Sequence, residues 1–400
     1  MAKIIHENLV NAVGEALHLI FQEGKYADRV IESTLKKNSK WGSRDRRFIA
    51  ETTYDVVRWW RWISSCGEIE ETDENKFRKA IDTWLVLQDS EERTWENENI
   101  EKEKIIANSK NLQSARAIRE SVPDWLDELG QGELPDKWEK ELHALNEQAR
   151  VVLRTNTIKT SIEDLREALR LADCETETLP SLPNALLLMK RANVFQQPVF
   201  KQGWFELQDA SSQTVAPFLE IQPGMRVVDA CAGAGGKTLH IAALMQNKGQ
   251  LIALDTEGWK LQELRHRARR AGAGMIETRT IDTTKVIKRL YDSADRVLLD
   301  VPCSGLGVIR RNPDAKWKLN LEYINRVHQL QKEIIERYSR MVKPGGKVVY
   351  ATCSILPSEN QLIVEQFLLA HPVFRLEEER QIFPSEGFDG FYMARLVRIN

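Results

Sequence analysis

Two cysteines have the setting expected of reactive thiols, because each follows a short apolar run. Cys303 lies in Asp300-Val-Pro-Cys-Ser-Gly305, and Cys353 lies in Ala351-Thr-Cys-Ser354. A single cysteine of this kind is more often a small buried hydrophobe than a catalyst. A pair in these two settings favours covalent catalysis, in which a thiolate attacks an electron-poor carbon such as one in a pyrimidine ring.

The apolar runs before the two cysteines predict buried strands, over Arg296–Asp300 and Lys347–Ala351. The same rhythm begins after Pro223-Gly224, and it predicts further strands over 226–229, 249–255 and 277–282 and helices over 237–245, 260–271 and 323–341. Strands that alternate with helices predict a Rossmann-like, doubly wound and mainly parallel α/β sheet. Ligands of such sheets bind at the carboxyl ends of the strands.

A glycine-rich turn, Val228–Thr238, joins the first of these strands to its helix. Three cofactors compete for it. A nucleotide P-loop fails because Cys231 occupies its first glycine position, and a dinucleotide fingerprint fails because Thr238 occupies its third. S-adenosylmethionine fits the acids better, since Asp255 can accept bonds from both ribose hydroxyls and Asp282 can bond near the adenine.

An isolated aspartate at a strand end is more often a helix cap or a turn former than a ligand. A series of them after a glycine loop reverses that preference. The expected S-adenosylmethionine site therefore contains Asp229, Cys231, Ala232, Gly233, Ala234, Gly235, Gly236, Lys237, Asp255, Asp282 and Asp300. Of these, Cys231 is expected to contribute only its backbone.

The composition predicts a soluble protein of two or three domains, because the 400 residues are 42% hydrophobic. There is no run of about 18 apolar residues and no signal peptide, so the expected location is the cytoplasm, away from membranes. Five cysteines without close spacing predict neither a disulfide framework nor a metal site. The net charge of −2 does not exclude an RNA partner, because a basic groove is a local property.

Changes in the sequence pattern predict three domains, with boundaries at 1–119, 120–205 and 206–400. The first is helical with a charged insertion, and one apolar helix face carries Val10, Val13, Leu17 and Ile20. The second is a small α+β unit, in which a helix capped by Ser161 lies between two strands. The third holds the Rossmann-like sheet and both cysteines of interest.

Several motifs together give the chain a specific resemblance. The Pro-Cys motif at Cys303, the Thr-Cys-Ser motif at Cys353, Gln208–Gln213, the Gly-Gly-Lys-Thr loop and Phe388–Tyr392 resemble those of the RNA cytosine-5 methyltransferases of the Fmu/Sun (RsmB) and Nop/NSUN family. The bacterial ribosomal-RNA branch is the most similar, and residues 1–119 resemble its NusB-like domain. Ala234 departs from the proline found in many members.

The resemblance implies a mechanism that uses both thiols. Cys353 would be the nucleophile that adds to carbon 6 of cytosine, and Cys303 would assist breakdown of the covalent adduct. Asp300 would bond the base near N3 and N4 and stabilise its protonated form. Because a thiolate needs a positive neighbour, Lys237 is the candidate cation. The implied cofactor is S-adenosylmethionine.

An RNA substrate must present a single-stranded or flipped cytosine, since the base has to leave its stack. The expected substrate is 16S-type ribosomal RNA, bound by a monomer. The expected RNA contacts are Lys237, Arg310, Arg311, Lys316 and Trp317, although an ordinary polar loop would have the same composition. The basic stretch Lys260–Arg270 is ambiguous, because a helix beside a sheet normally has a solvated charged face.

Four other functions are compatible with part of the pattern. A transfer-RNA cytosine-5 methyltransferase and a non-catalytic RNA-binding factor for ribosome assembly both remain open. A DNA cytosine-5 methyltransferase would use the Pro-Cys cysteine as nucleophile and would not need Cys353. An amino-group methyltransferase would carry Asn/Asp-Pro-Pro-Tyr where this chain has Asp300-Val-Pro-Cys303.

Overall fold

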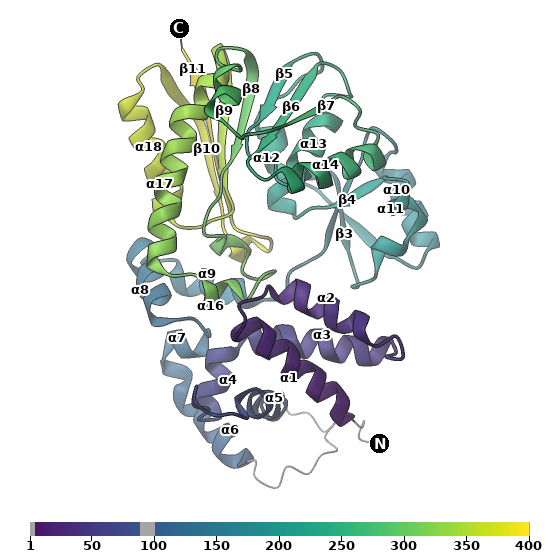
Figure 1. Ribbon diagram of the computed structural model, residues 1–400, viewed down its shortest axis with the longest axis vertical. Coiled ribbons are helices and arrows are strands. Elements are labelled where there is room, and N and C mark those ends of the chain that lie inside the picture. Colours follow the sequence, from purple (N-terminus) through teal and green to yellow (C-terminus); the bar gives the residue numbers. More distant parts are fainter. Residues whose placement is uncertain (1–4, 89–100, 400) are drawn as a thin grey trace. The chain divides into compact units, whose positions relative to one another are not determined.

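The computed structural model describes residues 5–88 and 101–399 (Figure 1), so part of the predicted charged insertion, 89–100, lies outside the described residues. The chain forms two compact units. The helical unit comprises residues 1–147 and 309–321, and the sheet unit comprises residues 148–308 and 322–400. Residues 120–147 and the short segment 309–321 thus pack with the helices, whereas the sequence predicts domains over 1–119, 120–205 and 206–400.

The helical unit consists of helices over a shared apolar core. Its elements are α1 (Glu7–Phe21), α2 (Ala27–Lys37), α3 (Ser43–Arg58), α4 (Trp60–Cys66), α5 (Lys76–Leu87), α6 (Lys102–Asn111), η1 (Leu112–Ser114), α7 (Arg116–Arg119), α8 (Asp124–Glu133), α9 (Trp138–Asn146) and α16 (Ala315–Lys318). The apolar face predicted for the first helix is confirmed, since Val10, Val13, Leu17 and Ile20 are all buried. No helix in 5–88 or 101–399 is both long and apolar enough to cross a membrane.

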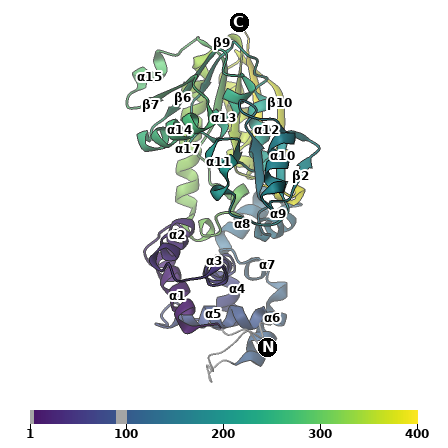
Figure 2. The same ribbon diagram turned by 90° about the vertical axis from the view of Figure 1, so that its right-hand side faces the viewer.

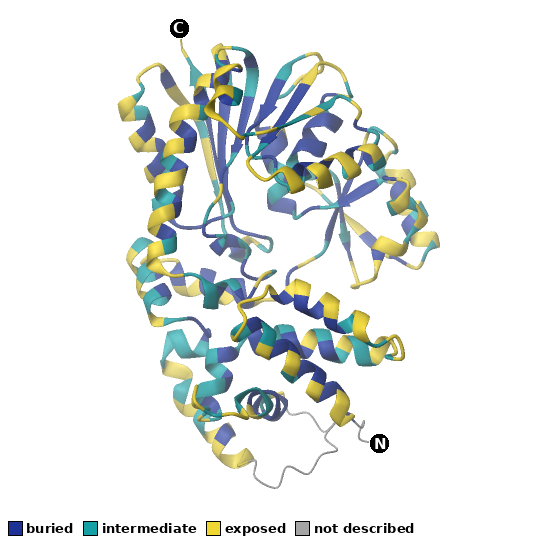
Figure 3. Ribbon diagram, in the orientation of Figure 1, coloured by how far each residue is buried: buried dark blue, intermediate teal, exposed yellow. Residues whose placement is uncertain are grey.

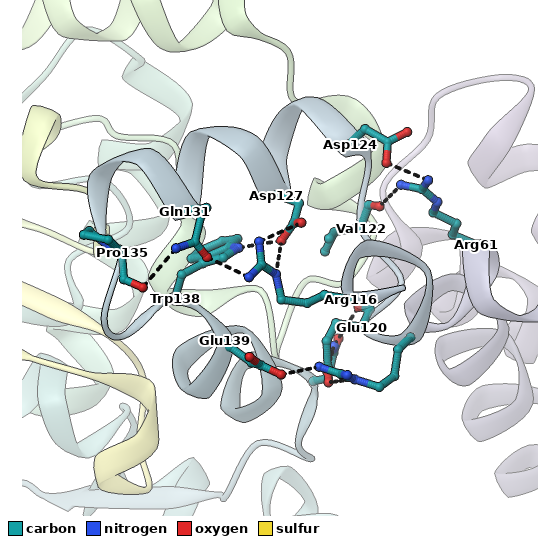
Figure 4. A network of polar contacts seen from close by, with 12 residues as sticks. Arg61, Arg116, Glu120, Val122, Asp124, Asp127, Gln131, Pro135, Trp138 and Glu139 are labelled. Atoms are coloured by element: carbon teal, nitrogen blue, oxygen red, sulfur yellow. Dashed lines mark hydrogen bonds and ion pairs between the residues drawn. The ribbon is translucent and has the colours of Figure 1, made fainter. Parts of the chain in front are cut away.

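A polar network explains why α8 and α9 belong to the helical unit (Figure 4). Asp127 of α8 accepts hydrogen bonds from Arg116 of α7 at 2.8 Å and from Trp138 of α9 at 2.7 Å. Arg61 of α4 pairs with Asp124 at 2.7 Å. These bonds link residues on both sides of position 119, where the sequence pattern changes.

Segment 309–321 supplies buried cations to the helical unit. The side chains of Arg310 and Lys316 are 2% and 1% exposed. The Lys316 ammonium donates to the Arg58 carbonyl at 2.8 Å and to Asn146 Oδ1 at 2.9 Å, and the Arg58 guanidinium donates to the Arg310 carbonyl at 2.9 Å. Burial lowers the pKa of Lys316 well below its usual value. The segment is thus an integral part of this unit's interior.

Replacing Trp317 with alanine is expected to lower the free energy of unfolding by about 3 kcal/mol. Its indole Nε1 donates to the Val57 carbonyl at 2.7 Å, and its ring packs on the α1 to α5 core. Urea unfolding of the full chain, followed by circular dichroism, measures the loss. Trp317→Phe, which keeps most of the packing and removes the donor, should lose about 1 kcal/mol. An unchanged unfolding midpoint for Trp317→Ala would contradict this structural role.

The sheet unit begins with a small antiparallel sheet of order β2-β3-β1-β4. Its elements are β1 (Val152–Thr155), α10 (Ile162–Leu171), β2 (Thr176–Leu179), β3 (Leu182–Leu188), η2 (Val194–Gln196), α11 (Pro198–Lys201) and β4 (Phe205–Leu207). The predicted helix cap is confirmed, because the Ser161 side chain accepts a hydrogen bond from the Asp164 amide. Buried residues of β1, β3 and α10 form the core of this small sheet.

The large sheet has seven strands in the order β10-β11-β9-β8-β5-β6-β7. Its elements are α12 (Ala210–Phe218), β5 (Arg226–Asp229), α13 (Gly236–Leu244), β6 (Gln250–Asp255), α14 (Gly258–Ala271), β7 (Ile276–Thr280), α15 (Thr284–Lys288), β8 (Ala294–Asp300), η3 (Leu306–Val308), α17 (Leu321–Tyr338), η4 (Ser339–Met341), β9 (Val342–Thr352), η5 (Pro357–Glu359), α18 (Gln361–Ala370), β10 (Phe374–Ile382), η6 (Pro384–Glu386) and β11 (Phe391–Arg398). Strands β5 to β9 are parallel, and β11 pairs antiparallel with β9. The predicted Rossmann-like, doubly wound sheet is confirmed.

Helices cover both faces of the large sheet (Figure 1, Figure 2). Along β8, Val297 and Leu299 pack on one face with α15, α17 and α18, whereas Leu298 packs on the other with α12, α13 and α14. Because both faces are covered, the central strands are buried throughout (Figure 3). The parallel register of Asp300 with Ala351 places the ends of β8 and β9 at the same edge of the sheet.

Candidate functional site

The two cysteines meet at the carboxyl edge of the large sheet. Cys303 follows the end of β8, Cys353 follows β9, and their Sγ atoms lie 3.2 Å apart. Both residues are partly buried. The hydrogen bond with Cys353, together with burial, raises the pKa of the Cys303 thiol well above its usual value. The Cys303 thiol is therefore protonated at neutral pH.

Two glycines hold the loops of this pair against each other. The Gly307 amide donates to the Cys353 carbonyl at 2.9 Å, and the Gly390 amide donates to the Gly307 carbonyl at 2.8 Å. A Cβ atom on Gly307 would lie 2.3 Å from the Gly390 carbonyl oxygen. The motif Phe388–Tyr392 thus acts on the site through close backbone packing, which only glycine permits at these positions.

A lysine links the glycine loop to the cysteine pair. Lys237 Nζ lies 2.7 Å from Asp300 Oδ2 and 4.8 Å from the centre of the Phe391 ring. Burial alone would lower the pKa of Lys237, but attraction to Asp300 and Cys353 outweighs it, so the pKa is raised. The ammonium of Lys237 therefore remains charged and paired with the Asp300 carboxylate.

The glycine loop has the shape of a ligand cradle. Gly233 and Gly235 have φ angles of 53° and 90°, and a Cβ on Gly235 would lie 2.1 Å from the Leu264 side chain. A Cβ on Gly233 would meet no atom within 4 Å, so open space lies beside the loop. Asp255 accepts from the Gly233 amide at 2.9 Å and from the Glu257 amide at 2.8 Å, and its carboxylate still has lone pairs for ribose hydroxyls.

Arg267 also holds the glycine loop in place, and the sequence analysis did not predict this role. One of its nitrogens donates to the Ala234 carbonyl at 2.8 Å, and another pairs with Glu206 of β4 at 2.9 Å. Glu206 also pairs with Arg270 at 2.5 Å. Arg267 and Arg270 of the basic stretch 260–270 are thus engaged inside the sheet unit, which resolves part of its ambiguity in favour of structure.

Two predicted cofactor residues lie deeper than expected. Asp229 is 1% exposed, accepts a hydrogen bond from the Thr238 hydroxyl at 2.7 Å and has an Oδ1 atom without a partner among the described residues. Burial raises the pKa of Asp229 to about 7, although the Thr238 bond opposes the shift. Burial likewise raises the pKa of the Cys231 thiol. The Thr238 bond also explains why threonine occurs where a dinucleotide fingerprint has glycine.

Replacing Asp229 with asparagine should stabilise the protein more at high pH than at low pH. Below the ordinary carboxyl pKa of 3.8 the group is neutral in both states. As the pH rises towards 7, the unfolded chain loses this proton first, so the wild-type protein loses stability. The advantage of the variant should grow by about 3 kcal/mol between pH 5 and pH 8, measured by urea unfolding. If the gain in stability of Asp229→Asn did not change with pH, the raised pKa of Asp229 would be refuted.

The remaining predicted cofactor residue, Asp282, is exposed just beyond β7. It borders a cavity of about 520 Å³ that Tyr291 and Tyr338 also line. The open space beside Gly233, the free lone pairs of Asp255 and the unpartnered oxygen of Asp229 fit a cofactor with hydroxyls and an amino group. The residues present are therefore compatible with S-adenosylmethionine.

Of the expected RNA contacts outside the glycine loop, Arg310 and Lys316 need correction. Both side chains are buried in the helical unit, where their nitrogens bond to carbonyls such as that of Ala144, 2.8 Å from Arg310. They have no exposed group for an RNA phosphate. Trp317 uses its indole nitrogen inside the same unit, and Arg311 is partly exposed. Basic and aromatic composition alone does not distinguish such interior anchors from surface contacts.

Comparison with known proteins gives consistent matches. A family model described as 16S rRNA methyltransferase RsmB/F matches residues 216–397, and a model for an RsmF/B-like, ferredoxin-like domain matches residues 122–195. The chain is 39% identical to the probable ribosomal RNA small subunit methyltransferase B of Synechocystis sp. over 264 residues, which cover 64% of this chain and 58% of that protein. It is 36% identical to the ribosomal RNA small subunit methyltransferase B of Vibrio cholerae over 292 residues, covering 70% and 66%. The matched regions span less than two thirds of these relatives.

Solved structures share the fold. The crystal structure of a protein designated PH0851 has a TM-score of 0.85 and 25% identity, with full coverage of both chains. NSun6 from Pyrococcus horikoshii has a TM-score of 0.65 and 21% identity, covering 70% of this chain and 99% of that one. The second likeness, at this identity, concerns the fold alone.

Proposed function

Because this chain belongs to the RsmB/F family of methyltransferases, we propose that it methylates carbon 5 of a cytosine in small-subunit ribosomal RNA. The observation that carries the proposal is the contact between the Cys303 and Cys353 thiols, 3.2 Å apart at the carboxyl edge of the sheet. Carbons 5 and 6 of cytosine are bonded neighbours. Two thiols this close can act on both carbons of one base.

Cys353 acts first in the proposed reaction. Its thiolate forms a bond to carbon 6, and the electron pair of the 5,6 double bond moves into the ring, which makes carbon 5 nucleophilic. Lys237, beside Asp300, stabilises the thiolate before attack. Addition at carbon 6 shifts electron density onto N3, which takes a proton from water, and Asp300 accepts a hydrogen bond from the resulting N3–H or from the N4 amino group.

S-adenosylmethionine is the proposed methyl donor, and when bound it supplies an electrophilic methyl group. Asp255 would hold its ribose, Asp282 its adenine, and the backbone of residues 231–236 would lie along its remaining length. The Asp255 carboxylate is already oriented by two backbone amides, those of Gly233 and Glu257, so it needs no rearrangement to accept the ribose hydroxyls.

Cys303 completes the proposed cycle. After carbon 5 has taken the methyl group, it still carries its hydrogen. Cys303, in its thiolate form, removes this proton, the electron pair restores the 5,6 double bond, and the bond from carbon 6 to Cys353 breaks. Because the pKa of Cys303 is raised, its thiolate is a stronger base than an ordinary one. Before this step Cys303 gives the proton that it holds at the start to a solvent water molecule, so that its thiolate is available as the base.

The choice of ribosomal RNA is supported by the names of the Synechocystis and Vibrio cholerae relatives, both of which are described as ribosomal RNA small subunit methyltransferase B. Bisulfite mapping of total RNA from cells with and without the gene tests it, since a 5-methylated cytosine resists deamination. We expect one or a few small-subunit cytosines to lose resistance when the gene is deleted. Loss of resistance only in transfer RNA would change the substrate, and no change at any cytosine would refute the proposed activity.

A further inference from the structure

Each cysteine of the pair is followed by a serine, and the two serine hydroxyls converge on one carboxylate. Ser304 and Ser354 both donate to Glu359 Oε2, and their Oγ atoms lie 3.3 Å apart. Glu359 lies in η5, beyond the second cysteine in sequence, and its side chain is completely buried. The carboxylate is therefore a shared anchor for the two cysteine loops.

Further bonds fix the position of this anchor. Glu359 Oε1 accepts from the Ser304 backbone amide at 2.7 Å and from Gln331 Nε2 of α17 at 3.3 Å. Gln331 also donates to the Pro302 carbonyl at 3.0 Å. The Glu359 carbonyl accepts from the Tyr350 hydroxyl at 2.7 Å. Glu359 is thus tied to β9, to α17 and to both loops at once.

Holding two loops together with a buried carboxylate carries a high cost in free energy. Taking it out of water costs several kcal/mol, and apolar residues of similar volume are often as stable or more stable. The carboxylate instead fixes the positions of its donors, because it can accept hydrogen bonds from two hydroxyls and two amides in defined directions. Motion of either loop alone would break a bond to the shared oxygen.

We propose that Glu359 is a positioning residue that sets the separation of the Cys303 and Cys353 thiols through Ser304 and Ser354. The inference rests on the proposed function, in which one thiol acts at carbon 5 and the other at carbon 6. Neither step tolerates displacement, since an error of about 1 Å at a reacting atom can cost roughly 100-fold in rate. Glu359 itself touches neither base nor cofactor.

Ser304 and Ser354 are expected to affect different steps of the reaction. Ser354 holds the loop of Cys353, so Ser354→Ala should slow attack and reduce the covalent protein–RNA adduct together with the product. Ser304 holds the loop of Cys303, so Ser304→Ala should slow release, and the adduct should accumulate relative to product. The Ser304 backbone amide still bonds Glu359 in that variant, so its defect should be the smaller.

The spacing of the thiols can be measured without RNA or cofactor. Phenylarsine oxide bridges two adjacent thiols: two As–S bonds form, and the arsenic-bound oxygen leaves as water with the two thiol protons, with no change of oxidation state. The full-length wild-type protein should gain one bridged arsenical by mass spectrometry, and Cys303→Ala and Cys353→Ala should not. Glu359→Ala should bridge much more slowly, while single alkylation of each cysteine by iodoacetamide continues.

Activity provides the second measurement. Glu359→Ala should lose about 100-fold in the methylation rate constant with little change in KM for RNA, and Glu359→Gln should restore part of it, because an amide can still bond one hydroxyl. Glu120→Ala is the matched control, since it removes a buried carboxylate of the helical unit, which accepts a hydrogen bond from Asn146 and contacts neither cysteine loop. It should lose stability while retaining bridging and methylation.

The outcomes separate the two proposals. Wild-type bridging and methylation in Glu359→Ala, Ser304→Ala and Ser354→Ala would overturn the positioning role. If Glu359→Ala fails to fold, the two serine variants decide by the same criteria. If the wild-type protein bridges the arsenical and Glu359→Ala does not, but no RNA is methylated by either, the geometry stands and the proposed function fails.

Discussion

Replacing Cys353 with alanine is expected to abolish methylation and to prevent any covalent protein–RNA adduct. The loss should be at least about 10⁴-fold, the scale seen when enzymes lose a covalent nucleophile. Replacing Cys303 should have a different result. Attack by Cys353 and methyl transfer can proceed, but the remaining proton on carbon 5 has no base, and the adduct persists. Denaturing gel electrophoresis with labelled RNA and S-adenosylmethionine would show it as a slowly migrating band.

The matched control is Cys174→Ala, another buried cysteine, which lies in the core of the small sheet. It should change neither the adduct nor the product. The opposite pattern, with adduct in Cys353→Ala and none in Cys303→Ala, would exchange the two roles and make Cys303 the nucleophile. The raised pKa of Cys303 argues against that arrangement, because a protonated thiol is a poor attacker at neutral pH.

Replacing Lys237 with methionine is expected to reduce methylation by about 100- to 1000-fold, the effect of losing one preorganised charged donor. Asp300 would lose its 2.7 Å partner, and Cys353 would lose the cation that attracts it. The change is almost isosteric, so the ring of Phe391 should keep its packing. The rate of iodoacetamide reaction with Cys353 at neutral pH should fall in parallel, since only the thiolate reacts.

Lys347→Met provides a comparison on β9, the strand that Cys353 follows. Lys347 is 16% exposed and pairs with Glu220 and Glu377, so its loss removes a similar ion pair away from the cysteines. That variant should lose stability and retain its rate of methylation at saturating substrate. If both lysine variants lose methylation equally, the effect of Lys237 is general destabilisation, and its proposed role beside the thiolate is wrong.

The sequence predicts the large sheet well where apolar runs are β-branched and buried on both faces, as in β5, β6 and β8. It misses β10, because only Phe374 of that strand is buried and the run Arg375–Arg380 is mostly charged. It also begins the strand before Cys353 at Lys347, whereas β9 already begins at Val342 and Gly345 accommodates a φ of 73°. Hydrophobic periodicity reveals a strand only when one face of the strand is buried, and the edge strand β10 has few buried residues.

Some residues of the candidate site could likewise be predicted from the sequence, and others could not. Cys303, Cys353, Asp300 and Lys237 come together: the first three lie at or just beyond the ends of β8 and β9, and Lys237 lies in the first turn of α13, which follows β5. Glu359 was missed, although a serine after each cysteine was a signal that both loops might share a partner. Glu359 lies in the short helix η5, and the spacing of residues in the sequence does not show which loops such a segment contacts in the folded chain. Burial of Lys316 was equally unforeseen, since its acceptors are carbonyls contributed by distant helices.

The position of segment 309–321 also affects how the chain folds as it is made. The helical unit leaves the ribosome first, but Lys316 and Trp317, which bond the carbonyls of Arg58 and Val57, follow only after all strands from β1 to β8 have been synthesised. Domains usually fold in the order of their synthesis. In this protein the helical unit therefore gains its last buried anchors only after β8 has been synthesised.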